Sequence, residues 1–152
     1  MSDTDMMELY SRRILALAAD IPHLGKLADA QGSAMKRSPQ CGSTVTAHVR
    51  MEGGRIAGFG QEVRACALGQ ASAGVLGQGA VGASRDEIAR GAAQLRAMLS
   101  EGGPVPDTPW QGLEALSPAR DYPNRHASIM LSWLALLDAI DAAEDGAPAK
   151  PE

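Results

Sequence analysis

The most regular pattern in the sequence is a strict alternation of apolar and polar residues from position 44 to position 51. Val45, Ala47, Val49 and Met51 point one way, and Thr44, Thr46, His48 and Arg50 point the other. A period of two predicts a strand with one buried face, and it places His48 in solvent. The turn residues 52–55 predict a hairpin. Residues 56–59 and 61–65 continue as two further short strands, with Gly58 and Gly60 marking a bend or bulge.

Helical spacing of apolar residues accounts for most of the remaining chain. We expect an amphipathic helix over about residues 4–19 and a loop over 26–40. Further helices are expected after Cys66, from the capping residue Ser84 to Gly102, over 110–116, and over 125–143. This order predicts an α+β fold in which a small three-stranded antiparallel sheet packs against helices. We expect one domain over residues 1–143 and a flexible tail over 144–152.

Length, composition and charge narrow the classes of function. The chain has 152 residues, of which 45% are hydrophobic, and a formal net charge of −4. Such a chain is long enough for a single globular core and carries no basic excess to bind nucleic acid or an anionic membrane. No apolar segment of about 20 residues is evident, and the acidic N-terminus does not resemble a signal peptide. We therefore expect a cytoplasmic protein.

Two cysteines, Cys41 and Cys66, are the candidate reactive groups. A meander of short strands brings its two ends to one edge of the sheet, so these thiols are expected to lie close together. The free amide groups at the start of the helix after Cys66 favour its thiolate form. Spacing alone leaves two interpretations open: a site for soft-metal or sulfur chemistry, or two small apolar residues that fill gaps in the core, which the spacing favours.

Four segments, in order, resemble one known family. Residues 38–43, Ser-Pro-Gln-Cys-Gly-Ser, are similar to the Asn-Pro-x-Cys-Gly-Asp loop of the IscU, SufU and NifU N-terminal iron–sulfur cluster assembly scaffolds. Residues 65–72 resemble that family's Gly-Cys-Ala-Ile-Ser-x-Ala-Ser. Residues 122–133 resemble its Pro-Val-Arg-x-x-Cys-x-x-x-x-Trp, and residues 20–25 resemble its Asn-Pro-Arg-Asn-x-Gly. The resemblance covers about residues 5–140 and implies a NifU/IscU/SufE-like fold.

The resemblance also implies a site, with departures from the family's pattern. Ser43 stands where the family has an aspartate, and Ser128 stands where it has a third cysteine. A neutral hydroxyl is a weaker ligand for a soft metal than a thiolate or carboxylate. The implied ligands for iron, zinc or a labile cluster are therefore Cys41 and Cys66, with His126 as a candidate third. Arg125 matches the family's arginine; it either stabilises a thiolate or persulfide or forms a surface ion pair.

Three functions follow from this resemblance. The first is a scaffold that holds iron, zinc or a transient iron–sulfur cluster, with ligands completed by a second copy in a homodimer or by a partner. The second is a SufE-like acceptor that takes a persulfide from a cysteine desulfurase on Cys66. The third is a non-catalytic adaptor. The expected partners are a desulfurase and other assembly proteins, and the absence of phosphate-loop, HExxH, nucleophile-elbow and Rossmann motifs argues against an enzyme.

Overall fold

The computed structural model describes residues 11–39 and 42–145. Its elements are, in chain order, α2 (Arg12–Ala19), β1 (Gly32–Arg37), β2 (Thr44–Glu52), β3 (Arg55–Arg64), α3 (Ala67–Gly79), α4 (Arg85–Glu101), the 3-10 helices η1 (Gln111–Asp121) and η2 (Pro123–Arg125), and α5 (His126–Asp145). The predicted three-stranded antiparallel sheet is confirmed, with strand order β1-β2-β3.

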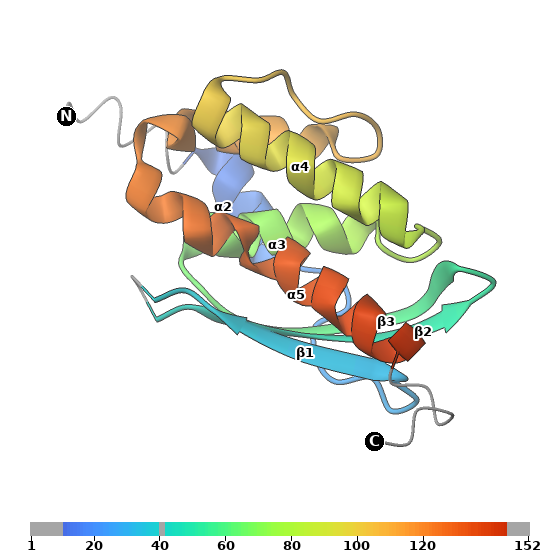
Figure 1. Ribbon diagram of the computed structural model, residues 1–152. Coiled ribbons are helices and arrows are strands. Elements are labelled where there is room, and N and C mark those ends of the chain that lie inside the picture. Colours follow the sequence, from blue (N-terminus) through green and yellow to red (C-terminus); the bar gives the residue numbers. More distant parts are fainter. Residues whose placement is uncertain (1–10, 40–41, 146–152) are drawn as a thin grey trace.

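The sheet forms one layer and the helices cover one of its faces (Figure 1). Helix α5 lies across β1 and β2, and α3 lies beside α5. Helix α4 packs on the side of α5 that faces away from the sheet. The inward residues of β2 are those predicted by the alternation: Val45, Ala47 and Val49 are all buried. They contribute to a continuous core that includes Leu68, Ile129 and Trp133, among others.

Two strands differ from those that the sequence pattern predicts. Strand β1 lies inside the expected loop of residues 26–40, and the two expected short strands form one continuous strand, β3. The inward positions of β1 are Gly32, Ala34 and Lys36, which give no apolar alternation. Glycine is required at position 32 because a Cβ there would lie 2.3 Å from the carbonyl oxygen of Ala139 in α5.

The expected irregularity near Gly58 and Gly60 is present without breaking β3. Arg50 pairs with Gly58 and Met51 pairs with Ile56, so Ala57 is the extra residue of a bulge in β3. At Gly60 a Cβ would come within 2.6 Å of the carbonyl oxygen of Gly25. This glycine therefore lets the loop after α2 approach β3 closely, where Gln61 N–H donates to the His23 carbonyl over 2.9 Å.

The prediction that His48 is solvated was wrong, since its side chain is only 12% exposed. On the helix-free face of the sheet, His48 lies between Ser33 of β1 and Glu62 of β3. Its Nδ1 is 2.7 Å from Ser33 Oγ and its Nε2 is 2.9 Å from Glu62 Oε1. The unpredicted strand β1 is the reason, because it covers one side of the imidazole ring.

The ends of α4 agree with the sequence signals, whereas the helix expected over residues 110–116 is the 3-10 helix η1, which continues to Asp121. Ser84 and Glu87 form the expected capping box of α4, and Gly102 ends that helix with a φ of +67°. Helix α2 begins after the capping residue Ser11; residues 1–10, where the first helix was expected to start, lie outside the described residues. Helix α5 continues two residues beyond its expected end, and residues 146–152 lie outside the described part of the chain.

One segment, contrary to expectation, is long and apolar enough to span a membrane. It covers residues 123–145, which include α5, and 61% of its most apolar window is buried inside the protein. Apolar residues on nearly every side of α5 meet the sheet, α3 and α4, so its composition is that of a central core helix.

Candidate functional site

The site lies at the edge of the sheet where β2 begins and β3 ends. Residues Thr44 and Arg64 are paired in the ladder, so Ser43 and Cys66, just outside it, occupy the same edge. Cys66 is the residue that precedes α3, with an extended backbone (φ −67°, ψ 170°). Ser128 joins them from the first turn of α5, where it is 2% exposed.

These three side chains form a short hydrogen-bonded chain. The distance from Cys66 Sγ to Ser128 Oγ is 3.5 Å, and Ser128 Oγ donates to Ser43 Oγ over 3.3 Å. In the contact between Cys66 and Ser128, either the thiol or the hydroxyl can be the donor. The three positions that the family likeness marked as aspartate, second cysteine and third cysteine thus converge on one point.

The packing around Ser128 leaves little free space. A Cβ on Gly69, in the first turn of α3, would lie 2.8 Å from Ser128 Oγ. One turn further along α3, Ser72 donates to the Ile129 carbonyl over 2.7 Å, which fixes the start of α5 against α3. Cys66 itself is half-buried and is a free thiol. The hydroxyls are therefore rigidly placed, and the sulfur is the group that a visiting molecule can reach.

The other predicted ligands are not part of this cluster. Cys41 lies outside the described residues. His126 Nε2 bonds the carbonyl oxygen of Ala119 over 2.9 Å, and the histidine lies two residues before Ser128 on a different face of α5. Among the described residues, no group of three or more His, Cys, Asp or Glu side chains could hold a metal ion.

Arg125 lies at the end of η2, half-buried, immediately before α5. Its backbone N–H donates to the Tyr122 carbonyl over 2.9 Å. In the described part of the chain its guanidinium takes part in none of the ion pairs.

A groove beside the cluster was not predicted from the sequence. This basic groove, of about 430 Å³, lies between the end of β1, the end of α4 and the start of α5. Its rim carries Lys36, Arg37, Arg96 and His126, and its floor is formed by Leu99, Met130, Leu131 and Leu134. Lys36 pairs with Asp138, whereas Arg37 and Arg96 form no ion pair with any described residue. Its residues come from three separate segments, one of them the unpredicted β1.

Comparison with known proteins gives a consistent set of relatives, although no family model matches the chain. A NifU-like protein (N-terminal) from Brucella abortus is 38% identical, with a TM-score of 0.90, and the match covers 94% of this chain and 99% of that one. The iron–sulfur cluster assembly scaffold protein IscU of Thermotoga maritima is 26% identical over 132 residues, 87% of this chain and 92% of that protein.

A third comparison concerns the fold alone. A putative iron–sulfur cluster assembly scaffold protein for the SUF system from Fervidobacterium islandicum is 23% identical, with a TM-score of 0.77. The match covers 88% of this chain and 98% of that one. All three relatives are matched over nearly their whole length, so the likeness extends over the sheet, the helices and the edge that carries Cys66.

Proposed function

The chain belongs to the family of the IscU, SufU and NifU N-terminal iron–sulfur cluster assembly scaffold proteins, and from this premise we propose that it takes part in iron–sulfur cluster assembly through its two thiols. The observation that supports the proposal is the meeting of Ser43, Cys66 and Ser128 within hydrogen-bonding distance. We include Cys41 because it stands two residues before Ser43 in the sequence. The proposed site therefore comprises both thiols.

The donor set decides how a cluster would be held. One thiol and two neutral hydroxyls are a weak set for iron or zinc, which favour thiolates, and an iron–sulfur cluster needs about four strong ligands. We propose that Cys41 and Cys66 supply two of these ligands as thiolates, while a second copy of the chain or a partner protein supplies the others. His126 completes the set only if its ring leaves the Ala119 carbonyl.

A persulfide acceptor is the second candidate function, favoured by the replacement of two ligand positions by serine. In this reaction the Cys66 thiolate attacks the outer sulfur of a persulfide on a cysteine desulfurase. A new sulfur–sulfur bond forms on Cys66, and the desulfurase cysteine leaves as a thiolate, with no net oxidation. The Ser128 hydroxyl, 3.5 Å from the sulfur, can then turn its proton toward the anionic Cys66.

The basic groove is the proposed docking place for such a partner. Two unpaired guanidinium groups, on Arg37 and Arg96, flank an apolar floor close to the start of α5. These features are complementary to a segment that carries carboxylates and apolar side chains. The same proposal assigns no catalytic turnover to this chain, since the bond-breaking step on free cysteine belongs to the desulfurase.

The deciding experiment compares wild-type protein with Cys41→Ala, Cys66→Ala and the control Ser132→Ala, all purified without oxygen. After reconstitution with iron and sulfide, the scaffold function predicts bound iron and sulfide in equal amounts, lost in both cysteine variants and kept in the control. After incubation with a desulfurase and cysteine, the acceptor function predicts an added mass of about 32 Da, one sulfur atom, lost only in Cys66→Ala. Protein that gains neither metal nor sulfur would contradict both functions.

A further inference from the structure

A second concave site lies on the other side of the helical layer. This α3–α4 cleft, of about 600 Å³, is bounded by the C-terminal end of α3, the first half of α4 and the loop before η1. Cys66 immediately precedes helix α3, and Gly79, the last residue of this helix, lines the cleft. Thirteen residues of helix separate the two by about 20 Å. The cleft is therefore distinct from the thiol site.

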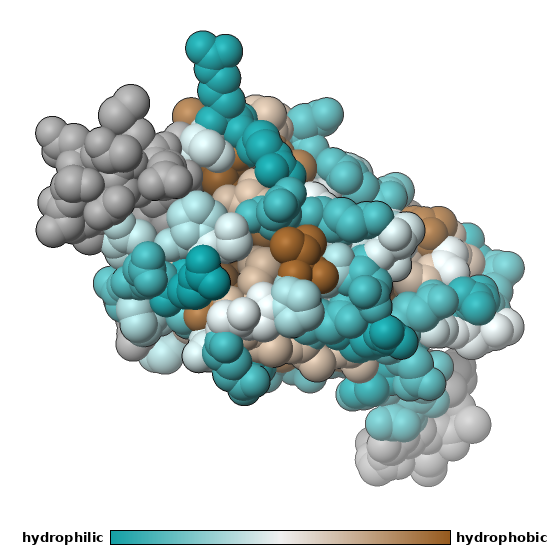
Figure 2. Space-filling model, turned by 90° about the horizontal axis from the view of Figure 1, so that it is seen from above, coloured by the Kyte–Doolittle hydropathy of each residue, from teal (hydrophilic) through white to brown (hydrophobic). Residues whose placement is uncertain are grey.

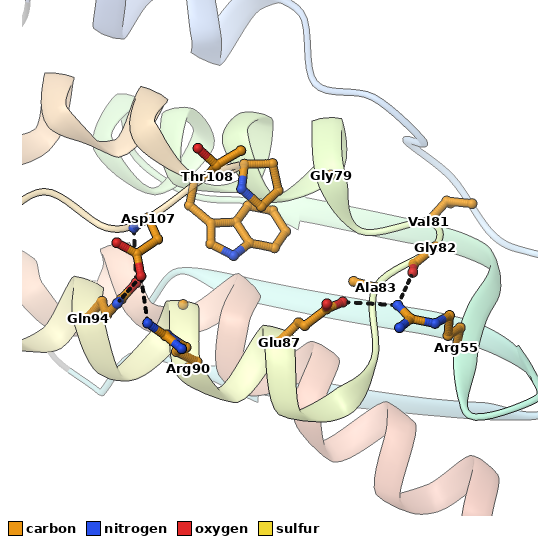
Figure 3. A pocket seen from close by; sticks show the side chains of 13 residues that line it. Arg55, Gly79, Val81, Gly82, Ala83, Glu87, Arg90, Gln94, Asp107 and Thr108 are labelled. Atoms are coloured by element: carbon orange, nitrogen blue, oxygen red, sulfur yellow. Dashed lines mark hydrogen bonds and ion pairs between the residues drawn. The ribbon is translucent and has the colours of Figure 1, made fainter.

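Two arginine–carboxylate pairs flank the cleft (Figure 3). On one side Arg90 Nη2 donates to Asp107 Oδ2 over 2.7 Å, and Gln94 Nε2 donates to the same oxygen over 3.0 Å. On the other side Arg55 Nη1 donates to the Gly82 carbonyl over 2.8 Å and to Glu87 Oε1 over 3.2 Å. Backbone groups also hold these side chains. The Asp107 N–H donates to the Gln94 side chain, and the Ser84 N–H donates to the Glu87 side chain.

The two carboxylates are ionised at neutral pH. The hydrogen bond from Gln94, followed by that from Arg90, lowers the pKa of Asp107. The backbone hydrogen bond from Ser84, together with the charge of Arg55, lowers the pKa of Glu87. Each carboxylate thus holds its arginine in place and neutralises its charge.

The two arginines nevertheless keep N–H groups that these bonds do not use. A guanidinium has five N–H groups, and at Arg55 and Arg90 the bonds described above involve one nitrogen each. Trp110 adds a further donor: it is only 3% exposed, and its indole N–H has no acceptor in the part of the chain that the structure describes. By contrast, the indole N–H of Trp133 donates to Ser72 Oγ over 3.0 Å.

The position of the Trp110 nitrogen places this donor at the cleft wall. A Cβ on Gly91, which lines the cleft, would lie 2.9 Å from Trp110 Nε1. The Trp110 nitrogen is not sealed from solvent, so water or a bound ligand can accept its hydrogen bond. Val81, which is 46% exposed, and Pro109 supply apolar surface in the same cleft.

We propose that the α3–α4 cleft binds a small organic carboxylate with an apolar group, about the size of an N-acyl amino acid. The carboxylate accepts from the Trp110 indole N–H and from free N–H groups of Arg90, and the apolar group lies on Pro109 and Val81. The volume falls within the range of small-molecule sites, about 300–1,000 Å³. Neither sulfur nor metal takes part, so this site is independent of the proposed function.

The exposed surface favours a small ligand rather than a protein partner with a broad interface. Seen from above, the helical face shows apolar residues only as small islands among hydrophilic side chains (Figure 2). The large exposed apolar residues are likewise dispersed over the described chain: Leu15, Leu24, Met35, Val81 and Val105. A broad apolar patch typical of a protein interface is not visible on this face.

The test uses the two tryptophans of the chain, whose indole N–H signals are separate probes in a nitrogen-15 correlation spectrum. Trp110→Phe identifies the Trp110 signal. Titration of the full chain with N-acetyl-leucine is expected to shift that signal in a saturable way and to leave the Trp133 signal in place. N-acetyl-leucinamide, which lacks the charge, is the matched control ligand and is expected to cause no saturable shift.

Variants separate recognition from folding. Arg90→Gln is expected to weaken binding about tenfold, through the loss of a charge-assisted hydrogen bond, and Arg90→Lys to recover part of it. Arg13→Gln removes an arginine of similar exposure from an ion pair with Glu114 outside the cleft and should leave binding unchanged. The proposal would be overturned if N-acetyl-leucine caused no saturable shift at concentrations up to about 10 mM. Equal binding of N-acetyl-leucinamide would also overturn it.

A further experiment distinguishes two possible ligands that share this chemistry, a free small carboxylate and the C-terminal carboxylate of a protein. A pentapeptide with a free C-terminal leucine carboxylate is compared with N-acetyl-leucine. Tighter binding of the pentapeptide identifies the occupant as the C-terminal end of another protein. Tighter binding of N-acetyl-leucine identifies it as a free small molecule.

Discussion

At the scale of single residues, the chemistry of the thiol site depends on which atom stands at position 128. Its Oγ lies 3.5 Å from the Cys66 sulfur, close to the spacing of two sulfur ligands on one metal ion. The variant Ser43→Asp/Ser128→Cys converts both hydroxyls to stronger ligands. We expect it to bind Zn²⁺ at least about tenfold more tightly than wild type, measured by competition with a chelating indicator without oxygen.

Ser132→Cys is the control for that experiment. Ser132 lies one turn further along α5 and is 2% exposed like Ser128, and its hydroxyl has no hydrogen-bond partner among the described residues. A thiol there adds the same sulfur without joining the cluster, so zinc affinity should equal that of wild type. If Ser132→Cys and the double variant gain equally, the cluster does not form the metal site.

Only part of this site was predictable from the residues themselves. Spacing of the two cysteines favoured a filling role in the core, and the family likeness alone pointed to Ser43 and Ser128. Their convergence depends on α5 bringing residue 128 to the end of β3, a contact between segments that are 62 residues apart. No local pattern in the sequence specifies such a contact. The pairing of Cys41 with Cys66 stays a prediction.

At the scale of elements, the close packing of β1 on α5 determines where the sheet meets the helices. We expect Gly32→Ala to lower the free energy of unfolding by about 3 kcal/mol, because its Cβ meets backbone atoms of Ala139 and Ala143, which cannot rotate away. Urea unfolding measures the change. Gly112→Ala is the control: its Cβ meets only the Val75 side chain, at 3.2 Å, and the expected loss is below about 1 kcal/mol.

The start of α4 gives a second element-scale prediction. Ser84 accepts a hydrogen bond from the Glu87 N–H over 3.2 Å, and Ser84→Ala is expected to cost about 1 kcal/mol of stability. Ser100→Ala in the same helix removes a hydroxyl that donates to the Arg96 carbonyl, and thermal unfolding should scarcely change. Equal effects of the two substitutions would contradict a specific capping role.

The helices were easier to predict than the strands, for a physical reason. Caps are local signals, so Ser84, Glu87 and Gly102 identify both ends of α4 within the sequence itself. Strand β1 has only small or charged inward residues, and at Gly32 α5 comes too close for any side chain. Its amphipathic pattern is therefore absent, and the sequence reads as a loop.

At the scale of the whole molecule, one ion pair joins the start of α4 to the last turns of α5. Arg85 donates to Asp141 through Nε over 2.7 Å and through Nη2 over 3.1 Å. The hydrogen bond from Arg85 lowers the pKa of Asp141. Because the folded state has the lower pKa, the stabilisation is complete above the ordinary aspartate pKa, about 4, and is lost as the pH falls through the lowered value.

Comparison with Asp141→Asn tests this dependence. The pair is 40% and 46% exposed, so we expect the variant to be less stable by at most about 1 kcal/mol at pH 7 in low salt. The difference in unfolding free energy should vanish in acid, where the wild-type carboxyl is also protonated. A difference that stays constant from neutral pH into acid would show that the ion pair is not its source.

Helix α3 sets the distance between Cys66 and the α3–α4 cleft. One end of the helix follows Cys66, and the other end, at Gly79, forms part of the wall of the α3–α4 cleft. Under the two proposals above, a ligand in the α3–α4 cleft lies too far from Cys66 to touch a persulfide there, so neither would exclude the other. A single copy of the chain therefore has room for a carboxylate in the cleft and a sulfur atom on Cys66 at the same time.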